Sequence, residues 1–446
     1  MEATVTSAEA SAPAQAIPGL PPGPRMPRAL QTAIWSRKAQ WMLEQSRARF
    51  GDMFTLKIAH EGTWVIVSDP EAIKQVFTGD PRVFHAGEGN QLLRPILGES
   101  SILVLDEKQH IGQRKLLLPP FHGERMQGYG EKMTEIAARE IESWPTGTPC
   151  KLRPRMQAIT LEIILETVFG VHGGERMEAL RGALRDFLDL TSDPRLLAPV
   201  ILIGPERIRG IPAFRRRIDR VDELIRRELA ERRAADDLAE RDDILSMLLA
   251  VRHEDGSPMS DAEVRDELLT LLVAGHETTA TALSWAMERL VRHPRKLERL
   301  RDEALAGEDA YLTATIQETL RLRPVLVLVL RKLTEPVEIG GYELPAGASV
   351  TPCIHLVHRN PEIYPAPDSF IPERFLDEPP GTYTWIPFGG GVRRCLGASF
   401  AQFEMQVVLR ELVKRHEIEP ADPTPERPFR RAITETPRHD ATVVLH

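Results

Sequence analysis

Apolar positions along the chain recur with a helical spacing over most of its length and alternate strictly only in short segments. The helical spacing predicts helices over about 30–50 and through most of 107–322. Strict alternation predicts a β-hairpin of two strands, Met53–Ile58 and Thr63–Val67. Residues from about 80 to 105 show few periodic signals. We therefore expect a long loop there, of the kind that often carries function.

The best defined helix begins at a capping box, Ser260-Asp261-Ala262-Glu263, and is expected to end near Arg292, before His293-Pro294. At about 1.5 Å per residue, or roughly 48 Å in all, it is long enough to cross a large domain. Its middle, 268–274, is apolar apart from Thr270, so we expect it to be buried.

The pattern changes after Pro324. The elements expected beyond it are short strands within 337–350, a proline-rich extended stretch to 375, a helix over 398–414 and strands around 433 and 443–444. The sequence shows neither repeats nor an interdomain linker. It therefore predicts one large, mainly α domain with a smaller β part over 20–446, preceded by a disordered tail over 1–19.

Composition and charge are those of an ordinary globular protein, with 42% hydrophobic and 27% charged residues among 446. The formal net charge of -8 argues against nucleic-acid binding. Cys150, Cys353 and Cys395 are too few and too widely spaced for a disulfide framework, which predicts a reducing cytoplasm. No apolar run approaches about 18 residues, so we expect no membrane span, and the N-terminus lacks the features of a signal peptide.

The ten residues around Cys395 have the strongest chemical signature in the chain: Phe388-Gly389-Gly390-Gly391-Val392-Arg393-Arg394-Cys395-Leu396-Gly397. Backbone N–H groups and the N-terminus of the following helix both favour a thiolate over a thiol. Such a thiolate can be a nucleophile or the axial ligand of a metal centre such as haem iron. The glycines let the backbone approach a flat group closely, and an arginine can pair with that group's carboxylates. The other two cysteines are expected to be small buried hydrophobes.

A second segment, Ala274-Gly275-His276-Glu277-Thr278-Thr279, disfavours the long helix that contains it. Glycine in a helix interior costs roughly 1 kcal/mol, and threonine is a poor helix former. Close packing against a partner would account for Gly275 alone. A distorted turn would account for the whole segment, because it would open a groove for a diatomic ligand, with Glu277 and Thr278 passing protons.

Three further patterns are weak when taken singly. Glu318 and Arg321 form an i,i+3 pair, to which Arg374 in Pro372-Glu373-Arg374-Phe375 could add a third, buried member. His110 and Arg114 share one helical face, where they could grip an anionic group. Arg331 closes an aliphatic run, and a charge in that position needs a partner.

Together these segments resemble the cytochrome P-450 family of haem-thiolate monooxygenases over nearly the whole chain from Leu20 onward. The cysteine loop matches the family signature Phe-x-x-Gly-x-Arg-x-Cys-x-Gly at every fixed position. The family's oxygen-activating helix motif, its Glu-x-x-Arg pair and its Pro-Glu-Arg-Phe segment are present in the right order. The resemblance implies the P-450 fold, with haem between the long central helix and the cysteine loop.

The resemblance implies that Cys395 is the thiolate ligand of the iron of haem b (iron protoporphyrin IX), with Phe388 beside the sulfur. Backbone N–H groups after the cysteine, up to Gly397, would tune the sulfur. The family's propionate-binding positions correspond to His110, Arg114, Arg331 and Arg393. His110 stands where many members carry tryptophan.

The motif of the long helix corresponds to the acid–alcohol pair that delivers protons to dioxygen, here Glu277 and Thr278. Ala274 and Gly275 would border the oxygen groove above the haem. The structural triad near the proximal face corresponds to Glu318, Arg321 and Arg374.

The implied reaction inserts one oxygen atom of O2 into a hydrophobic substrate and consumes two electrons and two protons. The chain ends at His446 without a flavin or reductase region. The resemblance therefore implies separate redox partners of ferredoxin or flavodoxin type with a reductase, docking near Arg394 and Lys115. It also implies a monomer of the soluble bacterial kind.

An aliphatic stretch, 325–330, corresponds to the family's segment beside the haem and supplies Leu326, Val327 and Val329 to the substrate pocket, with Ile433 added near the C-terminus. Such a wall predicts an apolar substrate, which is hydroxylated or epoxidised: a fatty acid, terpenoid, steroid or polyketide. Apolar residues over 196–203 either add to this wall, touch a membrane surface or simply pack. Three arginines either pair a substrate carboxylate or, as we favour, lie at the surface: Arg323, Arg430 and Arg431.

Other functions stay open at this point. A haem-binding sensor would not need Glu277 and Thr278, and a peroxygenase would work with peroxide alone. A cysteine hydrolase is disfavoured, because no histidine–acid partner is evident near Cys395.

Overall fold

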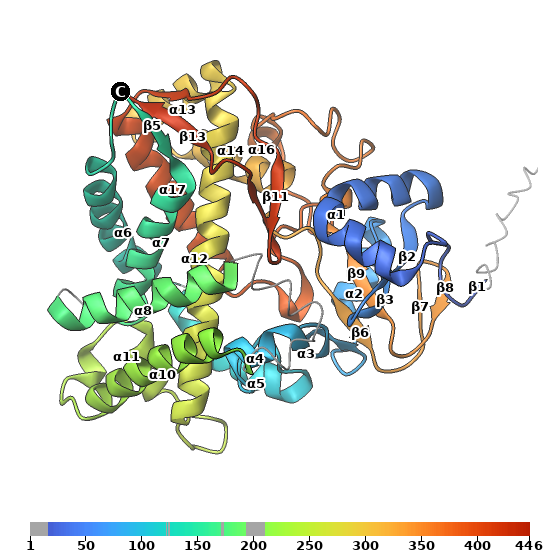
Figure 1. Cartoon of the computed structure of the whole chain (residues 1–446), viewed down its shortest axis with the longest axis horizontal. Coiled ribbons are helices and arrows are strands. Elements are labelled where there is room, and N and C mark those ends of the chain that lie inside the picture. The colour runs from blue at the N-terminus through green and yellow to red at the C-terminus, as the bar shows by residue number, and fades with distance from the viewer. Residues whose placement is uncertain (1–16, 122, 124, 171–173, 193–209) are drawn as a thin grey trace, which may run out of the picture.

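The longest helix, α12 (Asp261–Val291), runs through the middle of the helical part of the molecule (Figure 1). The computed structural model describes residues 17–121, 123, 125–170, 174–192 and 210–446. The predicted capping box is present: Ser260 Oγ accepts a hydrogen bond from the Glu263 N–H, and Glu263 Oε2 accepts one from the Ser260 N–H. The sequence prediction of this helix is confirmed.

Helices make up most of the described chain. Those before α12 are α1 (Arg28–Phe50), α2 (Pro70–Thr78), α3 (Ala86–Gly89), α4 (Arg94–Leu97), α5 (Glu107–Leu117), α6 (Arg125–Glu142), α7 (Leu152–Thr167), α8 (Gly174–Ser192), α10 (Pro212–Arg233) and α11 (Ile244–Ala250). Those after it are α13 (Pro294–Ala306), α14 (Ala310–Leu322), α15 (Ile354–Val357), α16 (Arg374–Asp377) and α17 (Ala398–Arg415). Short 3-10 helices are η1 (Gln91–Leu93), η2 (Pro119–Phe121), η4 (Leu238–Glu240) and η5 (Gly391–Arg393).

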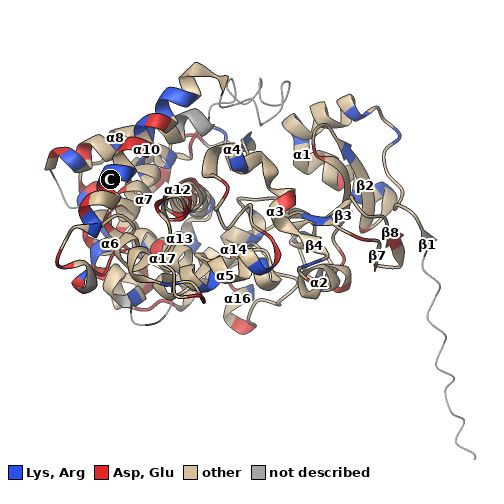
Figure 2. Ribbon diagram, turned by 90° about the horizontal axis from the view of Figure 1, so that it is seen from below, with Lys and Arg blue, Asp and Glu red and all other residues tan. Residues whose placement is uncertain are grey.

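The helices pack around α12, which contacts α7, α10, α13, α14 and α17. Figure 2, which views α12 nearly end-on, shows these helices around it and both signs of charge interspersed over α6, α8 and α10. The main apolar core lies here and includes Ile159, Leu268, Leu283 and Leu409. Because neighbouring helices surround the middle of α12, apolar residues lie almost all round it there. This explains why the middle of the helix lacks a polar face.

The strands form four small sheets in the described part of the chain. The largest has the order β2-β3-β9-β6-β4, and the others are β1-β8-β7, β10-β13-β5 and the hairpin β11-β12. Their bounds are β1 (Ile17–Pro18), β2 (Met53–Ile58), β3 (Gly62–Val67), β4 (Phe84–His85), β5 (Pro149–Lys151), β6 (Arg331–Leu333), β7 (Val337–Ile339), β8 (Tyr342–Leu344), β9 (Ser349–Pro352), β10 (Ile418–Pro420), β11 (Pro428–Arg431), β12 (Thr434–Pro437) and β13 (Thr442–Leu445).

The predicted hairpin is confirmed as β2 and β3, which pair from Met53 opposite Val67 to Ile58 opposite Gly62. With β9 and α1 they enclose a second core around Trp35 and Trp64, whose rings meet edge to face at 5.2 Å. Figure 1 shows this β-rich part beside the helical part. The predicted fold class, mainly α with a smaller β part, is confirmed.

The structure differs from the sequence prediction in two places. Residues 80–105 are not one loop, because they contain β4, α3, η1 and α4, elements too short to show periodicity. Ile433 lies in the turn between β11 and β12 and not within a strand. The expected tail, 1–19, falls mostly outside the described residues, although Ile17–Pro18 pairs with β8. The apolar residues at 196–203 also lie outside the described residues. None of the described helices is long and apolar enough to cross a membrane.

Candidate active site

The loop that carries Cys395 is held closed by backbone contacts. The Cys395 N–H donates to the carbonyl of Phe388 at 2.9 Å. Gly389 and Gly391 have φ values of +66° and +64°, which glycine adopts without strain. A Cβ on Gly391 would lie 2.0 Å from the carbonyl oxygen of Phe77 on α2, so only glycine fits there. The loop is therefore shaped by backbone packing before any cofactor is considered.

The Cys395 thiol is accessible although protein surrounds it, whereas Cys150 and Cys353 are buried as expected. Burial raises the pKa of Cys395, and it outweighs the opposing effects of the Gly397 N–H and the charge of Arg114. The backbone N–H of Gly397 does favour the thiolate, as expected of the loop, but in the protein by itself burial has the larger effect. A metal cation on the sulfur would supply the missing stabilisation, because a coordinating thiol is deprotonated outright.

A cluster of cations lies next to the cysteine loop. Arg331 on β6 is 6% exposed, and burial together with the charge of Arg393 lowers its pKa to about 9. The pKa of Arg393 falls to about 10 because of burial, although Asp106 opposes that shift. Arg114 on α5 faces both Arg393 and Cys395. Three guanidinium groups from separate parts of the sequence are thus brought together.

Asp106 is the one carboxylate bonded within this cluster among the described residues. Arg393 donates to its Oδ1 at 2.5 Å and also to the carbonyls of Ile102 and Leu105. Three arginines against one aspartate leave two positive charges in excess, which suits the two carboxylates of haem. His110 adds no charge, because burial and the nearby arginines lower its pKa to about 3. Its role is that of a neutral side chain and not of a second cation beside Arg114.

The motif on α12 is partly exposed. Ala274 is exposed in the middle of this otherwise buried helix, and Thr278 is half-exposed one turn later. Thr278 Oγ1 donates to the Ala274 carbonyl at 2.5 Å. The helix is unbroken through this segment, so the expected distorted turn is not seen. A Cβ on Gly275 would meet Ile164 of α7 at 3.2 Å, which means that glycine here allows α7 to pack closely.

The shorter contacts of the Glu277 carboxylate come from α7. Gln157 Nε2 donates to its Oε2 at 2.5 Å, and Arg153 Nη1 lies 3.4 Å from its Oε1. Burial raises the pKa of Glu277, although Arg153 and then Gln157 lower it. A carboxyl held in this way can keep a proton closer to neutral pH than an exposed glutamate can.

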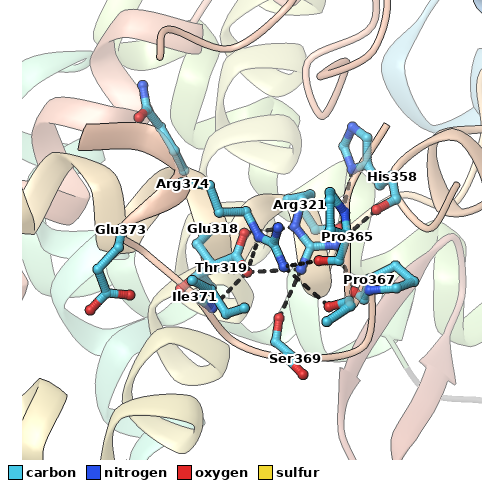
Figure 3. A network of polar contacts seen from close by, with 12 residues as sticks. Glu318, Thr319, Arg321, His358, Pro365, Pro367, Ser369, Ile371, Glu373 and Arg374 are labelled. Atoms are coloured by element: carbon cyan, nitrogen blue, oxygen red, sulfur yellow. Dashed lines mark hydrogen bonds and ion pairs between the residues drawn. The ribbon is translucent and has the colours of Figure 1, made fainter. Parts of the chain in front are cut away.

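Figure 3 shows the third predicted constellation around Glu318 and Arg321 on α14. Arg321 Nε and Nη2 donate to the two Glu318 oxygens at 2.6 and 2.8 Å, and both side chains are wholly buried. Arg374 Nε lies 3.3 Å from Glu318 Oε1. Arg321 also donates to the carbonyls of His358, Pro367 and Ser369, which ties α14 to the segment before the cysteine loop.

His358 extends this network to the cysteine loop. Its Nε2 accepts from the Ile386 N–H at 2.8 Å, so its Nδ1 carries the proton and donates to the Arg321 carbonyl at 3.2 Å. Burial holds its pKa well below the usual range, and the ring is therefore neutral. Nothing in the local sequence marks His358, because its partners come from α14 and the loop 37 and 28 residues away.

The residues predicted for the substrate pocket separate in the structure. Leu326 and Val329 pack beside the cluster that contains Phe77, and a Cβ added to Gly389 of the cysteine loop would lie 3.8 Å from Val329. Val327 is 6% exposed and packs with Trp35, so its assignment to the pocket is not supported. The run of aliphatic residues in the sequence does not show which side chains join which cluster.

Ile433, at the turn between β11 and β12, is 53% exposed, as expected for a residue that meets a ligand or solvent. The preference for surface arginines is wrong for two of the three candidates. Arg430 stacks on Trp35 and donates to the Trp35 carbonyl at 3.1 Å. Arg323 stacks on Trp285, and burial lowers its pKa to about 9.

Sequence reasoning missed several residues of this site: Asp106, Arg153, Gln157 and His358. Asp106 had a usable signal, because an aspartate directly before a helix is a common N-cap. Here it accepts from the N–H groups of Gly87 and Glu88 and orients Arg393.

Comparisons with known proteins agree with one another. The family model described as Cytochrome P450 matches residues 17–442. Cytochrome P450 135B1 of Mycobacterium tuberculosis is 45% identical over 438 residues, which cover 95% of this chain and 91% of that protein. Cytochrome P450 135A1 of the same species is 40% identical, with 96% and 95% covered.

Among solved structures, the fold is similar to that of a retinoic acid-bound cyanobacterial CYP120A1, with a TM-score of 0.83 and 24% identity. That match covers 96% of this chain and 99% of the other. A cytochrome P450DA heme domain has a TM-score of 0.80 at 22% identity, with 97% and 98% covered. These two likenesses show the fold alone.

Proposed function

The chain belongs to the cytochrome P450 family, and from that membership we propose that it inserts one oxygen atom of O2 into an apolar substrate. Members of this family are haem-thiolate oxidoreductases, so the cofactor is haem with a cysteine ligand. The observation that carries the proposal is the accessible Cys395, placed beside three arginines to which, within the described residues, Asp106 alone supplies a bonded carboxylate.

We assign the haem ligand to Cys395 and its propionates to Arg114, Arg331 and Arg393, with His110 as a neutral partner. When bound, the haem activates O2, and electron donation from the thiolate favours O–O cleavage. The protein's part is to orient the groups, exclude water and hold protons. The triad of Glu318, Arg321 and Arg374 holds the segment that leads to the cysteine loop.

Proton supply falls to Glu277 and Thr278. The Thr278 hydroxyl is an acceptor and donor on the half-exposed side of α12, and its proton now bonds the Ala274 carbonyl. Glu277 lies behind it, and burial raises the pKa of its carboxyl. A group that exchanges its proton closer to neutral pH suits this role.

The substrate is apolar, on the support of Leu326, Val329 and Ile433. These residues present aliphatic side chains near the cysteine loop or at the β11–β12 turn. A fatty acid, terpenoid, steroid or polyketide has the matching chemistry. Screening such a library for a high-spin shift of the haem spectrum would narrow the class.

Electrons come from a redox partner, and we propose the ferredoxin or flavodoxin type. Arg394 is exposed directly before the ligand cysteine, and Lys115 is exposed on α5, where it pairs with Glu254 at 2.8 Å. Both offer positive charge to an acidic partner. The domain limits, the monomeric state and the cytoplasmic location stay predictions.

The deciding experiment is the difference spectrum of the reduced, carbon-monoxide-bound protein. We expect the red-shifted Soret band of a thiolate ligand, its loss in Cys395→Ser and its retention in Cys353→Ser, which alters a buried cysteine elsewhere. Absence of the band from the wild type overturns the proposal. Turnover with peroxide but not with O2 and a donor would indicate a peroxygenase, and turnover with neither would indicate a sensor.

A further inference from the structure

The carboxylate of Glu277 is held by a different helix from the one that carries it. Gln157 and Arg153, on α7, bond its two oxygens at 2.5 and 3.4 Å. The other described contact, from Thr281 on α12, is longer at 3.5 Å. Since α7 supplies both main contacts, the orientation of Glu277 depends on where the start of α7 is fixed.

The start of α7 is fixed by the C-terminal strand region. Arg153 Nε donates to Asp440 Oδ1 at 2.7 Å, and the Arg153 N–H donates to the Asp440 carbonyl at 3.0 Å. Pairing of β5 with β13 sets Lys151 opposite Thr442, two positions before Arg153 and two positions after Asp440. Both Arg153 and Asp440 are buried, so their hydrogen bond holds the Arg153 side chain in one orientation.

Two further cations lie near the Asp440 carboxylate. Arg431 on β11 lies 3.6 Å from its Oδ1, and Lys151 Nζ lies 3.5 Å from its Oδ2. The Lys151 side chain is 64% exposed, so the network that begins at the buried Glu277 reaches solvent there. Arg153 is the only described side chain that bonds both carboxylates.

The charges that face Glu277 are few. Arg153 from α7 and Arg431 from β11 both favour its ionised form, while burial opposes it more strongly. The neighbouring His276 is neutral, because burial lowers its pKa to about 4, and Arg185 on α8 faces that histidine. Arg153 has the largest effect on Glu277 of any charged group.

We propose that Arg153, anchored by Asp440, is a positioning residue that sets both the direction and the charge of the Glu277 carboxyl. The inference rests on the proposed role of Glu277 in proton supply. A guanidinium stays protonated at all relevant pH values, so Arg153 does not itself pass protons. Its loss frees the carboxyl to turn and removes a nearby positive charge, which raises the pKa of Glu277 further.

The test uses the haem-loaded enzyme, O2 and a surrogate plant-type ferredoxin with its reductase, so that no substrate need be known. Peroxide released per O2 consumed is measured against pH for Arg153→Gln, Arg153→Lys and Asp440→Asn. The matched control is Arg155→Gln, which removes an arginine of α7 that lies near Cys150. The solvent isotope effect on O2 consumption is recorded in parallel.

We expect Arg153→Gln to change the peroxide yield by at least about threefold and to move the midpoint of its pH dependence to higher pH. Asp440→Asn should move this midpoint in the same direction. Arg153→Lys should keep most of the wild-type pH profile, and Arg155→Gln should leave the midpoint unchanged. An unmoved midpoint and isotope effect in Arg153→Gln and Asp440→Asn overturn the inference, even where melting temperature or haem content falls.

If Arg153→Gln does not fold, Asp440→Asn decides the question by the same midpoint. Failure of the proposed function is distinguishable, because it would appear in the wild type, as absence of the thiolate band or of O2 consumption. A wild type with both properties and variants with an unmoved midpoint would refute only the positioning role.

Discussion

Glu318 and Arg321 are joined by two hydrogen bonds, of 2.6 and 2.8 Å, with both side chains wholly buried. A buried ion pair is stable only when its remaining donors are satisfied, and Arg321 meets this condition through three backbone carbonyls. The carbonyls belong to 358, 367 and 369, which precede the cysteine loop. The pair therefore acts as a brace between α14 and that segment.

Arg321→Lys should destabilise the protein by about 3–5 kcal/mol, because a lysine cannot reproduce the two-pronged contact or the carbonyl bonds. Urea denaturation and haem content per chain measure the effect. Arg301→Lys is the control, since its contact with Glu417 is at the surface and should contribute little. Full haem content and a wild-type midpoint in Arg321→Lys would contradict the brace.

Arg331→Leu should release haem faster, by roughly 10- to 100-fold, because it removes the buried cation that we assign to a propionate. Transfer of haem to an excess of apomyoglobin gives the rate without any need for turnover. The neighbouring Lys332→Leu removes a half-exposed cation that pairs with Glu88 at 3.1 Å, and it should release haem at the wild-type rate. Equal rates for the two variants would remove Arg331 from the cofactor site.

Local sequence was enough for the parts of this site whose chemistry is local. Three features depend only on residues that lie close together in the sequence: the glycines around Cys395, the capping box at Ser260 and the Glu318–Arg321 pair. The hairpin β2–β3 was predictable for the same reason, because alternation and a glycine turn specify it.

The rest depends on contacts between distant segments. Arg393 meets Asp106 across 287 positions, and Arg153 meets Asp440 across the same separation. Burial of the Cys395 sulfur raises its pKa against the effect of the loop's N–H group, and a sequence does not display that burial. The assignment of Val327 to the substrate pocket has no support from its packing, and a wholly aliphatic run does not show in sequence which side chains join which cluster.

Thr278→Ala should uncouple the enzyme, raising peroxide released per O2 several-fold, because the hydroxyl that holds a proton on this side of α12 is removed. Thr278→Ser keeps the hydroxyl and should keep most of the coupling. The amounts of NAD(P)H consumed and peroxide formed are measured together. If the alanine variant couples like the serine variant, Thr278 has no part in proton supply.

Stability should depend on Glu267, whose Oε1 accepts from the Ile102 N–H at 2.8 Å and from Gln113 at 3.0 Å. Burial raises its pKa from 4.5 to about 8. Between these values the folded protein keeps a proton that the unfolded chain has released, so the free energy of unfolding falls as pH rises through about 8.

Glu267→Gln cannot titrate, and it should remove this fall, which is on the order of 4 kcal/mol. Urea midpoints from about pH 5 to about pH 9 measure the change. Glu298→Gln, an exposed position on α13, is the control and should keep the wild-type slope. A slope that is unchanged in Glu267→Gln would show that this carboxyl is ionised throughout the range.

Arg394→Glu should slow electron transfer from an acidic ferredoxin at low salt, because it reverses an exposed charge next to the ligand cysteine. We expect a loss of about tenfold that shrinks as ionic strength rises, since screening weakens the attraction in the wild type as well. Stopped-flow reduction under carbon monoxide measures the rate. Arg216→Glu makes the same reversal on exposed α10 and should leave the rate unchanged. If both variants slow equally, net charge and not docking at Arg394 governs the encounter.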